Sequence, residues 1–170
     1  GSNIVWRDEG FPGLVLVNKI AGRDILSEDG NSVTIKVGAG EVWDEVAARA
    51  AGNGWSGIEF LSLIPGTAGA APVQNIGAYG AELSSTLTEL SLYDLQEKRF
   101  DILLPADCGF GYRTSRFKTT DKDRFLILSI TLKLNKKVPQ PPFYEALEKY
   151  FAQNNITQFS PKVVRDAVIA

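Results

Sequence analysis

Histidine and methionine are absent from this sequence of 170 residues, and cysteine occurs once, at Cys108. Without histidine, imidazole-based acid–base catalysis and the usual zinc sites are excluded, and we expect no metal site. A single cysteine excludes an internal disulfide framework and favours a reducing compartment. Because even position 1 lacks methionine, we expect a chain that was trimmed or that begins partway through a larger protein, with Gly1-Ser2 as a tag remnant the alternative.

An excess of charge of one sign and long hydrophobic runs are also missing. The 18 Lys and Arg against 20 Asp and Glu give a formal net charge of −2, and the basic residues are scattered, which disfavours a nucleic-acid partner or a polybasic membrane surface. No apolar run approaches the roughly 20 residues of a transmembrane helix, and no secretory pattern opens the chain. We therefore expect a globular, cytoplasmic protein without a membrane partner. Its oligomeric state does not follow from the sequence.

The hydrophobic pattern predicts several strands. Residues 14–18 and 32–37 have strand character, and a hairpin between them is plausible. Residues 90–95 and 99–104 flank a short polar turn, which predicts an antiparallel pair. Residues 124–134 form the clearest strand. Its alternating apolar residues, expected on one face in the core, are Leu126, Leu128, Ile130, Leu132 and Leu134.

Helical patterns lie between and after these strands. Trp43, Val46, Ala47 and Ala50 follow the i, i+3, i+4, i+7 spacing of one apolar helix face, and residues 52–54 (Gly-Asn-Gly) predict its end. A second helix is expected over 145–151. Ser160-Pro161 predicts a third through the preferences for serine at the N-cap and proline at the first helical position. Together these patterns favour an α+β protein.

A segment rich in glycine and alanine, residues 64–83 (IPGTAGAAPVQNIGAYGAEL), has Glu82 as its only charged residue. Small residues let the backbone approach a ligand closely, and outward N–H groups can hold a phosphate. One interpretation is therefore a wall for a large anionic cofactor. The alternative is a closely packed helix–turn crossing.

The same segment lacks the G-x-G-x-x-G and G-x-x-x-x-G-K-[ST] nucleotide motifs. It instead resembles the signature IPG-x-x-G-x-x-P-x-QNIGAYG-x-E of the UDP-N-acetylenolpyruvoylglucosamine reductase (MurB) family. Three other segments resemble motifs of that family in the same order: Gly1-Ser2-Asn3 its G-x-G-S-N turn, residues 37–43 its V-G-A-G-x-x-W junction, and residues 108–118 (CGFGYRTSRFK) its C-x-F-x-Y-R-x-S-x-F-K segment.

The resemblance implies a fold and a division of the chain. The fold would be the α+β FAD-binding fold of the vanillyl-alcohol oxidase and p-cresol methylhydroxylase type, with a mixed to antiparallel sheet and flanking helices. Residues 1–137 would be the central FAD-binding lobe without its N-terminal part. Residues 138–170 would be a linker and the truncated start of a substrate-binding region.

The resemblance also implies a reaction. In this family FAD takes hydride from NADPH and passes it to the enolpyruvyl ether of UDP-N-acetylglucosamine, which gives UDP-N-acetylmuramate for peptidoglycan, the polymer that sets cell shape. Arg113 matches the catalytic arginine, and a guanidinium can hold a carboxylate in two-point contact. Without the surrounding motif, a surface ion pair or a turn-capping residue would be the better interpretation of this arginine.

The remaining site residues follow from the same resemblance. Hydroxyl side chains are common in the family where this sequence has Ala70 and Ala71, so we expect weaker cofactor binding here. The implied substrate-binding residues are Tyr79, Tyr112 and Tyr144. The implied cofactor-binding residues are Ser2, Asn3, Ile64, Pro65, Gly66, Thr67, Gly69, Ala70, Ala71, Val73, Asn75, Gly77 and Ile127.

Two elements of the family pattern do not occur in this sequence. The proton-donating serine belongs to an N-A-G-S-F-F-K-N-P segment, and a catalytic glutamate follows later still. Without the serine, we expect protonation of the substrate by this chain alone to fail or to be left to water. A non-catalytic module that binds flavin or a sugar nucleotide is therefore the alternative function, and a different oxidase of the same superfamily is a third.

Overall fold

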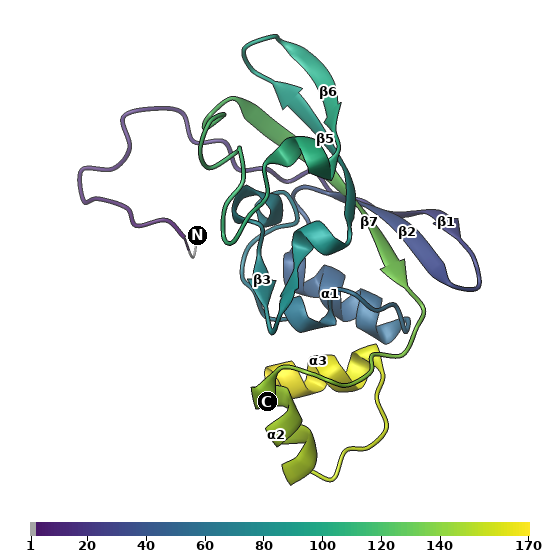
Figure 1. The fold of residues 1–170 in the computed structure, drawn as a ribbon. Coiled ribbons are helices and arrows are strands. Elements are labelled where there is room, and N and C mark those ends of the chain that lie inside the picture. The colour runs from purple at the N-terminus through teal and green to yellow at the C-terminus, as the bar shows by residue number, and fades with distance from the viewer. Residues whose placement is uncertain (1–2) are drawn as a thin grey trace.

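The computed structural model describes residues 3–170 and is built on one five-stranded antiparallel sheet (Figure 1). The strands lie in the order β1-β2-β7-β5-β6. Every pairing in this sheet is antiparallel, as the alternation of apolar residues favours. Their bounds are β1 (Arg23–Glu28), β2 (Ser32–Gly38), β5 (Leu87–Asp94), β6 (Arg99–Leu103) and β7 (Phe125–Asn135).

The central strand β7 is confirmed, but its apolar face is not the one that simple alternation predicts. Ile130, Leu132 and Leu134 are buried as expected. The register between β5 and β7 shifts beside Leu128, where an extra residue forms a β-bulge. The bulge moves the alternation by one residue, so Ile127 is buried whereas Leu126 and Leu128 are only partly buried.

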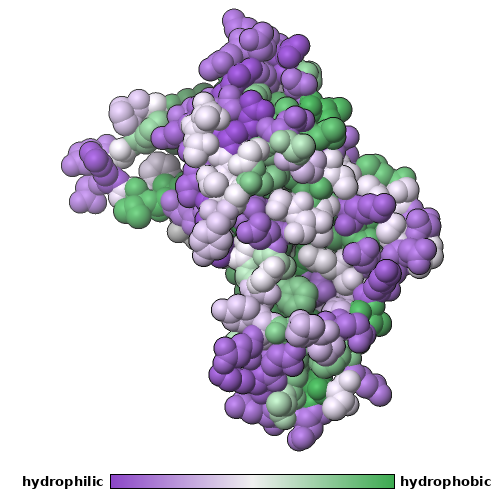
Figure 2. Space-filling view, viewed as in Figure 1, coloured by the Kyte–Doolittle hydropathy of each residue, from purple (hydrophilic) through white to green (hydrophobic). Residues whose placement is uncertain are grey.

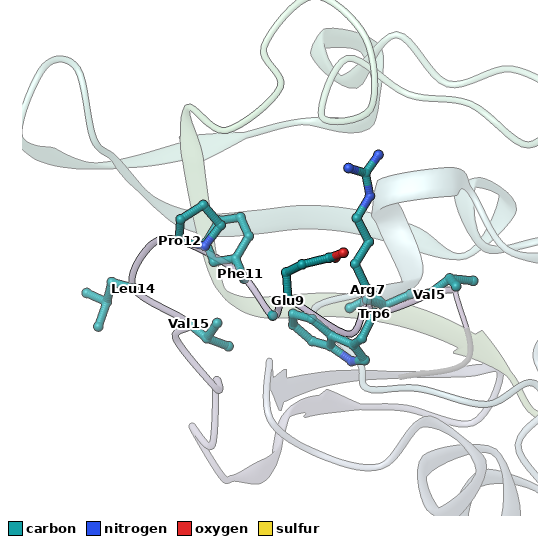
Figure 3. Close-up of a pocket in the computed structure, with 10 residues that line it drawn as sticks. Val5, Trp6, Arg7, Glu9, Phe11, Pro12, Leu14 and Val15 are labelled. Carbon is teal, nitrogen blue, oxygen red and sulfur yellow. The ribbon is translucent and has the colours of Figure 1, made fainter.

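The predicted strand at residues 14–18 is wrong. These residues belong to an N-terminal arm without regular structure, and the hairpin partner of β2 is β1 instead. Leu14 is 80% exposed and Leu16 is 65% exposed, because no strand within the described chain lies beside them. The arm lies at the left of Figures 1 and 2, and in Figure 3 Trp6, Glu9 and Phe11 are close together while Leu14 is turned away.

The helix α1 (Trp43–Gly52) covers the core face of the sheet. Its predicted apolar face is confirmed, since Trp43, Val46, Ala47 and Ala50 are all buried. The helix ends at Gly52, as the following Asn-Gly pair predicts. In Figure 1, α1 lies between the sheet and α3 (Pro161–Ile169), and α1 and α3 are in contact.

The C-terminal helices α2 (Glu145–Gln153) and α3 form a second, smaller core, which includes Leu147, Phe151 and Val164. The Ser160 hydroxyl accepts a hydrogen bond from the Val163 amide, so the predicted N-cap is confirmed. The guanidinium of Arg165 binds both carboxylate oxygens of Asp44 at the start of α1, at 2.6 and 2.9 Å. This ion pair joins α3 to α1, and Phe60 and Tyr79 also pack against the small core.

Short elements complete the fold. The strands β3 (Gly77–Ala78) and β4 (Ala81–Glu82) form a separate hairpin. Single 3₁₀ turns occupy Glu59–Leu61, Ala71–Gln74, Leu83–Ser85 and Pro105–Cys108. Across residues 3–170, no helix combines the length and apolar character that crossing a bilayer requires.

Candidate functional site

Six of the predicted cofactor-binding residues line one shallow pocket: Asn3, Ile64, Pro65, Thr67, Ala70 and Ala71. Trp43, Gln74 and Ile76 complete its lining. The cavity volume is about 20 Å³, which is the room of one water molecule. A cavity of this size does not enclose a dinucleotide, so these residues would form only one wall of a cofactor site. Ser2, also predicted to bind the cofactor, lies outside the described residues.

The pocket wall is held by the junction between β2 and α1. The amides of Ala68 and Gly69 donate to the carbonyls of Glu41 and Ala39, at 2.8 and 2.9 Å, and the Trp43 amide donates to the Gly66 carbonyl at 3.0 Å. Two of the segments that resemble family motifs therefore lie side by side. An added Cβ at Gly69 would lie 2.6 Å from the Ala39 Cβ, so this glycine permits the close approach.

An ion pair and a hydrogen bond of Glu41 also hold the junction between β2 and α1. The carboxylate of Glu41 accepts a hydrogen bond from the Gly22 amide at 2.8 Å and pairs with the Arg23 guanidinium. The Gly22 amide and the Arg23 guanidinium hold the pKa of Glu41 below its usual range. The start of β1 is thereby attached to the turn that carries the pocket wall.

Within residues 64–83, the main-chain amides that remain open to a phosphate lie in one turn. The amides of Ala70 and Ala71 donate to the Thr67 carbonyl, and the Ile76 amide donates to the Ala71 carbonyl, so these groups are already used within the chain. Within the described residues, the amides of Gly66 and Thr67 have no acceptor. Gly66 has φ +119°, and the nearest atom to an added Cβ would be 4.0 Å away. This turn keeps the open backbone that an anion requires.

The other predicted cofactor residues lie behind the wall rather than on it. Asn75 and Ile127 are buried, and the Val73 carbonyl accepts the Ser115 hydroxyl at 2.6 Å. An added Cβ at Gly77 would lie 2.9 Å from the Ala81 carbonyl oxygen, so this glycine is required by the β3–β4 hairpin itself. A motif match alone does not separate residues that face a ligand from those that support them.

Arg113 lies at the tip of a tight turn. Gly111 and Thr114 exchange two backbone hydrogen bonds of 3.2 Å, which leaves Tyr112 and Arg113 at the end of the loop. Arg113 has φ +54°, and both side chains are exposed. Within residues 3–170 the guanidinium makes no ion pair, and its closest aromatic neighbour is Tyr112, with the ring centroid 6.0 Å away. The group is available to an external anion.

Two of the predicted substrate-binding tyrosines meet in the structure. Tyr79 lies at the tip of the β3–β4 hairpin and Tyr144 directly precedes α2, and their rings contact edge-to-face with centroids 5.8 Å apart. The third, Tyr112, lies on the Arg113 turn. The structure thus brings residues 64–83 and the C-terminal helices together at one aromatic contact.

Sequence reasoning missed three pocket residues. Trp43 was expected only as a core residue of its helix, and Gln74 and Ile76 were not singled out for the cofactor. The signal for Trp43 was present in the V-G-A-G-x-x-W junction, because a residue at the first turn after such a junction lies next to whatever the glycines approach. Gln74 and Ile76 carry no comparable signal outside their motif.

Cys108 is expected to be unreactive. Its thiol is fully buried and lies 3.3 Å from the Leu104 carbonyl, and burial raises its pKa to about 11. Iodoacetamide at pH 8 should therefore modify the native protein about 100-fold more slowly than an ordinary exposed thiol. Mass spectrometry of timed samples measures the rate, and the urea-unfolded protein is the control. Equal rates for folded and unfolded protein would contradict the buried placement.

Comparison with known proteins assigns the family. A family model described as an FAD binding domain matches residues 1–98, more than half of the chain. The chain belongs to the FAD binding domain family. The match confirms FAD as the cofactor that the sequence resemblance implied.

The sequence of this FAD binding domain protein is similar to known reductases over its whole length. It is 41% identical to UDP-N-acetylenolpyruvoylglucosamine reductase of Alcanivorax borkumensis and 39% identical to that of Thermobifida fusca, each over 100% of this chain. These alignments cover 49% and 48% of the relatives, so the chain spans about half the length of the curated relatives it matches. The resemblance to the MurB family is confirmed.

A solved structure agrees with the fold. The crystal structure of UDP-N-acetylenolpyruvylglucosamine reductase (MurB) from Thermus caldophilus matches with a TM-score of 0.52 and 28% identity, over 71% of this chain and 41% of that chain. The predicted fold class, an α+β FAD-binding fold with a mixed to antiparallel sheet and flanking helices, is therefore confirmed, and the sheet is antiparallel.

Proposed function

We propose that this chain supplies the FAD-facing wall and part of the substrate site for the NADPH-linked reduction of UDP-N-acetylglucosamine enolpyruvate to UDP-N-acetylmuramate. The observation that carries the proposal is the arrangement of the site. A pocket wall of small residues with an open turn at Gly66-Thr67 belongs to the same segment that supports the turn of Arg113. The relatives with that reductase name match along the whole chain.

The chemical character of the pocket residues suits a flavin dinucleotide. Ile64, Pro65, Ala70 and Ala71 offer an apolar surface to a ring, and the amides of Gly66 and Thr67 are free to meet a phosphate oxygen. When bound, FAD would supply hydride transfer between NADPH and the enolpyruvyl group. The chain's own residues would bind the cofactor and exclude water from one of its faces.

Arg113 would bind the enolpyruvyl carboxylate of the substrate. Its exposed guanidinium has no ion-pair partner among the described side chains, and an arginine side chain stays protonated at physiological pH. Such a cation would stabilise negative charge that develops next to the carboxylate during reduction. Tyr79, Tyr112 and Tyr144 would contact the nucleotide sugar through their ring faces and hydroxyl groups.

The division of the chain and its cellular role belong to the same proposal. Residues 1–137 would be the cofactor-binding part, and residues 138–170 would begin the substrate-binding part. The protein would act in the cytoplasm in peptidoglycan precursor synthesis, on a UDP-sugar and without a nucleic acid or membrane partner. The alternative is a flavin or sugar-nucleotide binding module without turnover.

Arg113→Ala should lower the affinity of the chain for UDP-N-acetylglucosamine enolpyruvate about tenfold, because one charge-assisted hydrogen-bond pair with the carboxylate is lost. Calorimetry with FAD present measures this affinity, and flavin fluorescence measures FAD binding separately. Arg113→Lys should retain part of the affinity, and both variants should bind FAD as the unmodified chain does. An unmodified chain that binds neither FAD nor the enolpyruvyl nucleotide would overturn the proposed function.

A further inference from the structure

Asn75 is a buried polar residue whose side chain joins three segments. It is 1% exposed, and its backbone is left-handed with φ 45° and ψ 66°. Its Nδ2 donates to the Glu82 carboxylate at 2.9 Å and to the Gly111 carbonyl at 3.2 Å. Its Oδ1 accepts from the Ser84 amide at 3.0 Å. Both side-chain donors and the acceptor are therefore used inside the protein.

These contacts explain why asparagine occupies the position. Asparagine tolerates the left-handed region better than most residues. Its amide has two donors, and here they serve two acceptors, the Glu82 carboxylate and the Gly111 carbonyl. Aspartate has nearly the same shape but no donor when ionised, so it would place a second carboxylate beside Glu82 and a lone pair toward the Gly111 oxygen.

The Gly111 carbonyl belongs to the turn that carries Arg113. Gly111 closes the turn through its two hydrogen bonds with Thr114, so the residue that fixes Gly111 also fixes the tip. The other side of the turn is held by the same segment, because the Ser115 hydroxyl donates to the Val73 carbonyl at 2.6 Å. Residues 73–75 therefore hold the turn at both ends.

We infer that Asn75 is a positioning residue for Arg113: it sets the orientation of the guanidinium through Gly111 and does not itself contact the cofactor or the substrate. The inference rests on the proposed function, since Arg113 is the group that would meet the carboxylate. It differs from the role that the sequence implied for Asn75, which was direct cofactor contact.

A double-mutant cycle with the enolpyruvyl nucleotide tests the inference in the whole chain. Asn75→Asp should lower the affinity for the nucleotide about tenfold in the unmodified background and leave it nearly unchanged in the Arg113→Ala background, because interacting residues are not additive. FAD affinity should not change. An equal loss of nucleotide affinity in both backgrounds, or a loss of FAD binding by Asn75→Asp, would overturn it.

Amide hydrogen exchange in the chain without ligand separates this inference from the proposed function. Asn75→Asp should speed the exchange of the Thr114 amide about tenfold, because that amide donates to the Gly111 carbonyl. Asn154→Asp is the matched control, since the Asn154 side chain donates only to the Tyr150 carbonyl at an exposed helix end. Unchanged exchange at Thr114 in Asn75→Asp would overturn the positioning role, whether or not the chain binds the nucleotide.

Discussion

Trp43→Ala should lower the free energy of unfolding by about 3–5 kcal/mol, the range measured when a large aromatic side chain is removed from a core. Trp43 is 1% exposed, and its indole Nε1 donates to the Leu61 carbonyl at 2.9 Å. The substitution therefore creates a cavity and also leaves a buried carbonyl without its donor. Because the ring lines the candidate pocket, FAD affinity should fall as well.

Urea unfolding followed by far-UV circular dichroism measures the change in stability. Trp6→Ala is the matched control: Trp6 lies on the N-terminal arm and is 56% exposed, so its loss should change the stability by no more than about 0.5 kcal/mol. Equal shifts of the two urea midpoints would show that the indole of Trp43 does not contribute to the core in this way.

Gly69→Val should destabilise the fold by about 3 kcal/mol, because the added side chain has no space. The new Cβ would lie 2.6 Å from the Ala39 Cβ and 3.1 Å from the Ala39 Cα and carbonyl oxygen. Ala39 cannot move away easily, since it is fully buried and its amide donates to the Leu128 carbonyl at 2.9 Å. The segment of residues 37–43 would separate from the segment of residues 64–83, and the pocket between them would be disrupted.

Gly52→Ala is the control for this second substitution. Gly52 is the last residue of α1, and an added Cβ there would meet no atom within 4 Å. Alanine should therefore be neutral or stabilise the helix by up to about 1 kcal/mol. Differential scanning calorimetry of both variants would detect the contrast. A Gly69→Val protein as stable as Gly52→Ala would show that the junction at Ala39 is not closely packed.

Local patterns predicted most of the fold. The alternation in β2, the helical spacing from Trp43 to Ala50 and the cap at Ser160 each depend on neighbours within a few residues, so the sequence contains them in full. The bulge at Leu128 and the pairing of β1 depend on another strand. In β1 the two apolar residues, Ile25 and Leu26, are adjacent, so the strand has no alternating hydrophobic pattern.

The candidate site was predictable as a set of segments but not as a surface. The motifs predict cofactor contact for Pro65, Thr67 and Ala70, and the structure shows that these three residues line one pocket beside the junction of β2 and α1. The motifs did not show that Asn75 and Gly77 face inward. The direction of a side chain in such a loop follows from left-handed backbone angles and from distant acceptors, which no period in the sequence records.

Asp44 gives the pocket a physical link to the far end of the chain. One of its carboxylate oxygens accepts both the Leu63 amide at 2.7 Å and the Arg165 guanidinium at 2.6 Å. Leu63 immediately precedes the pocket residue Ile64, whereas Arg165 belongs to α3. A displacement of α3 would remove the Arg165 guanidinium from the Asp44 oxygen that accepts the Leu63 amide. The hydrogen bond beside the pocket residue Ile64 would then be held less firmly. The shared Asp44 oxygen is thus one direct link between the position of α3 and the pocket residue Ile64.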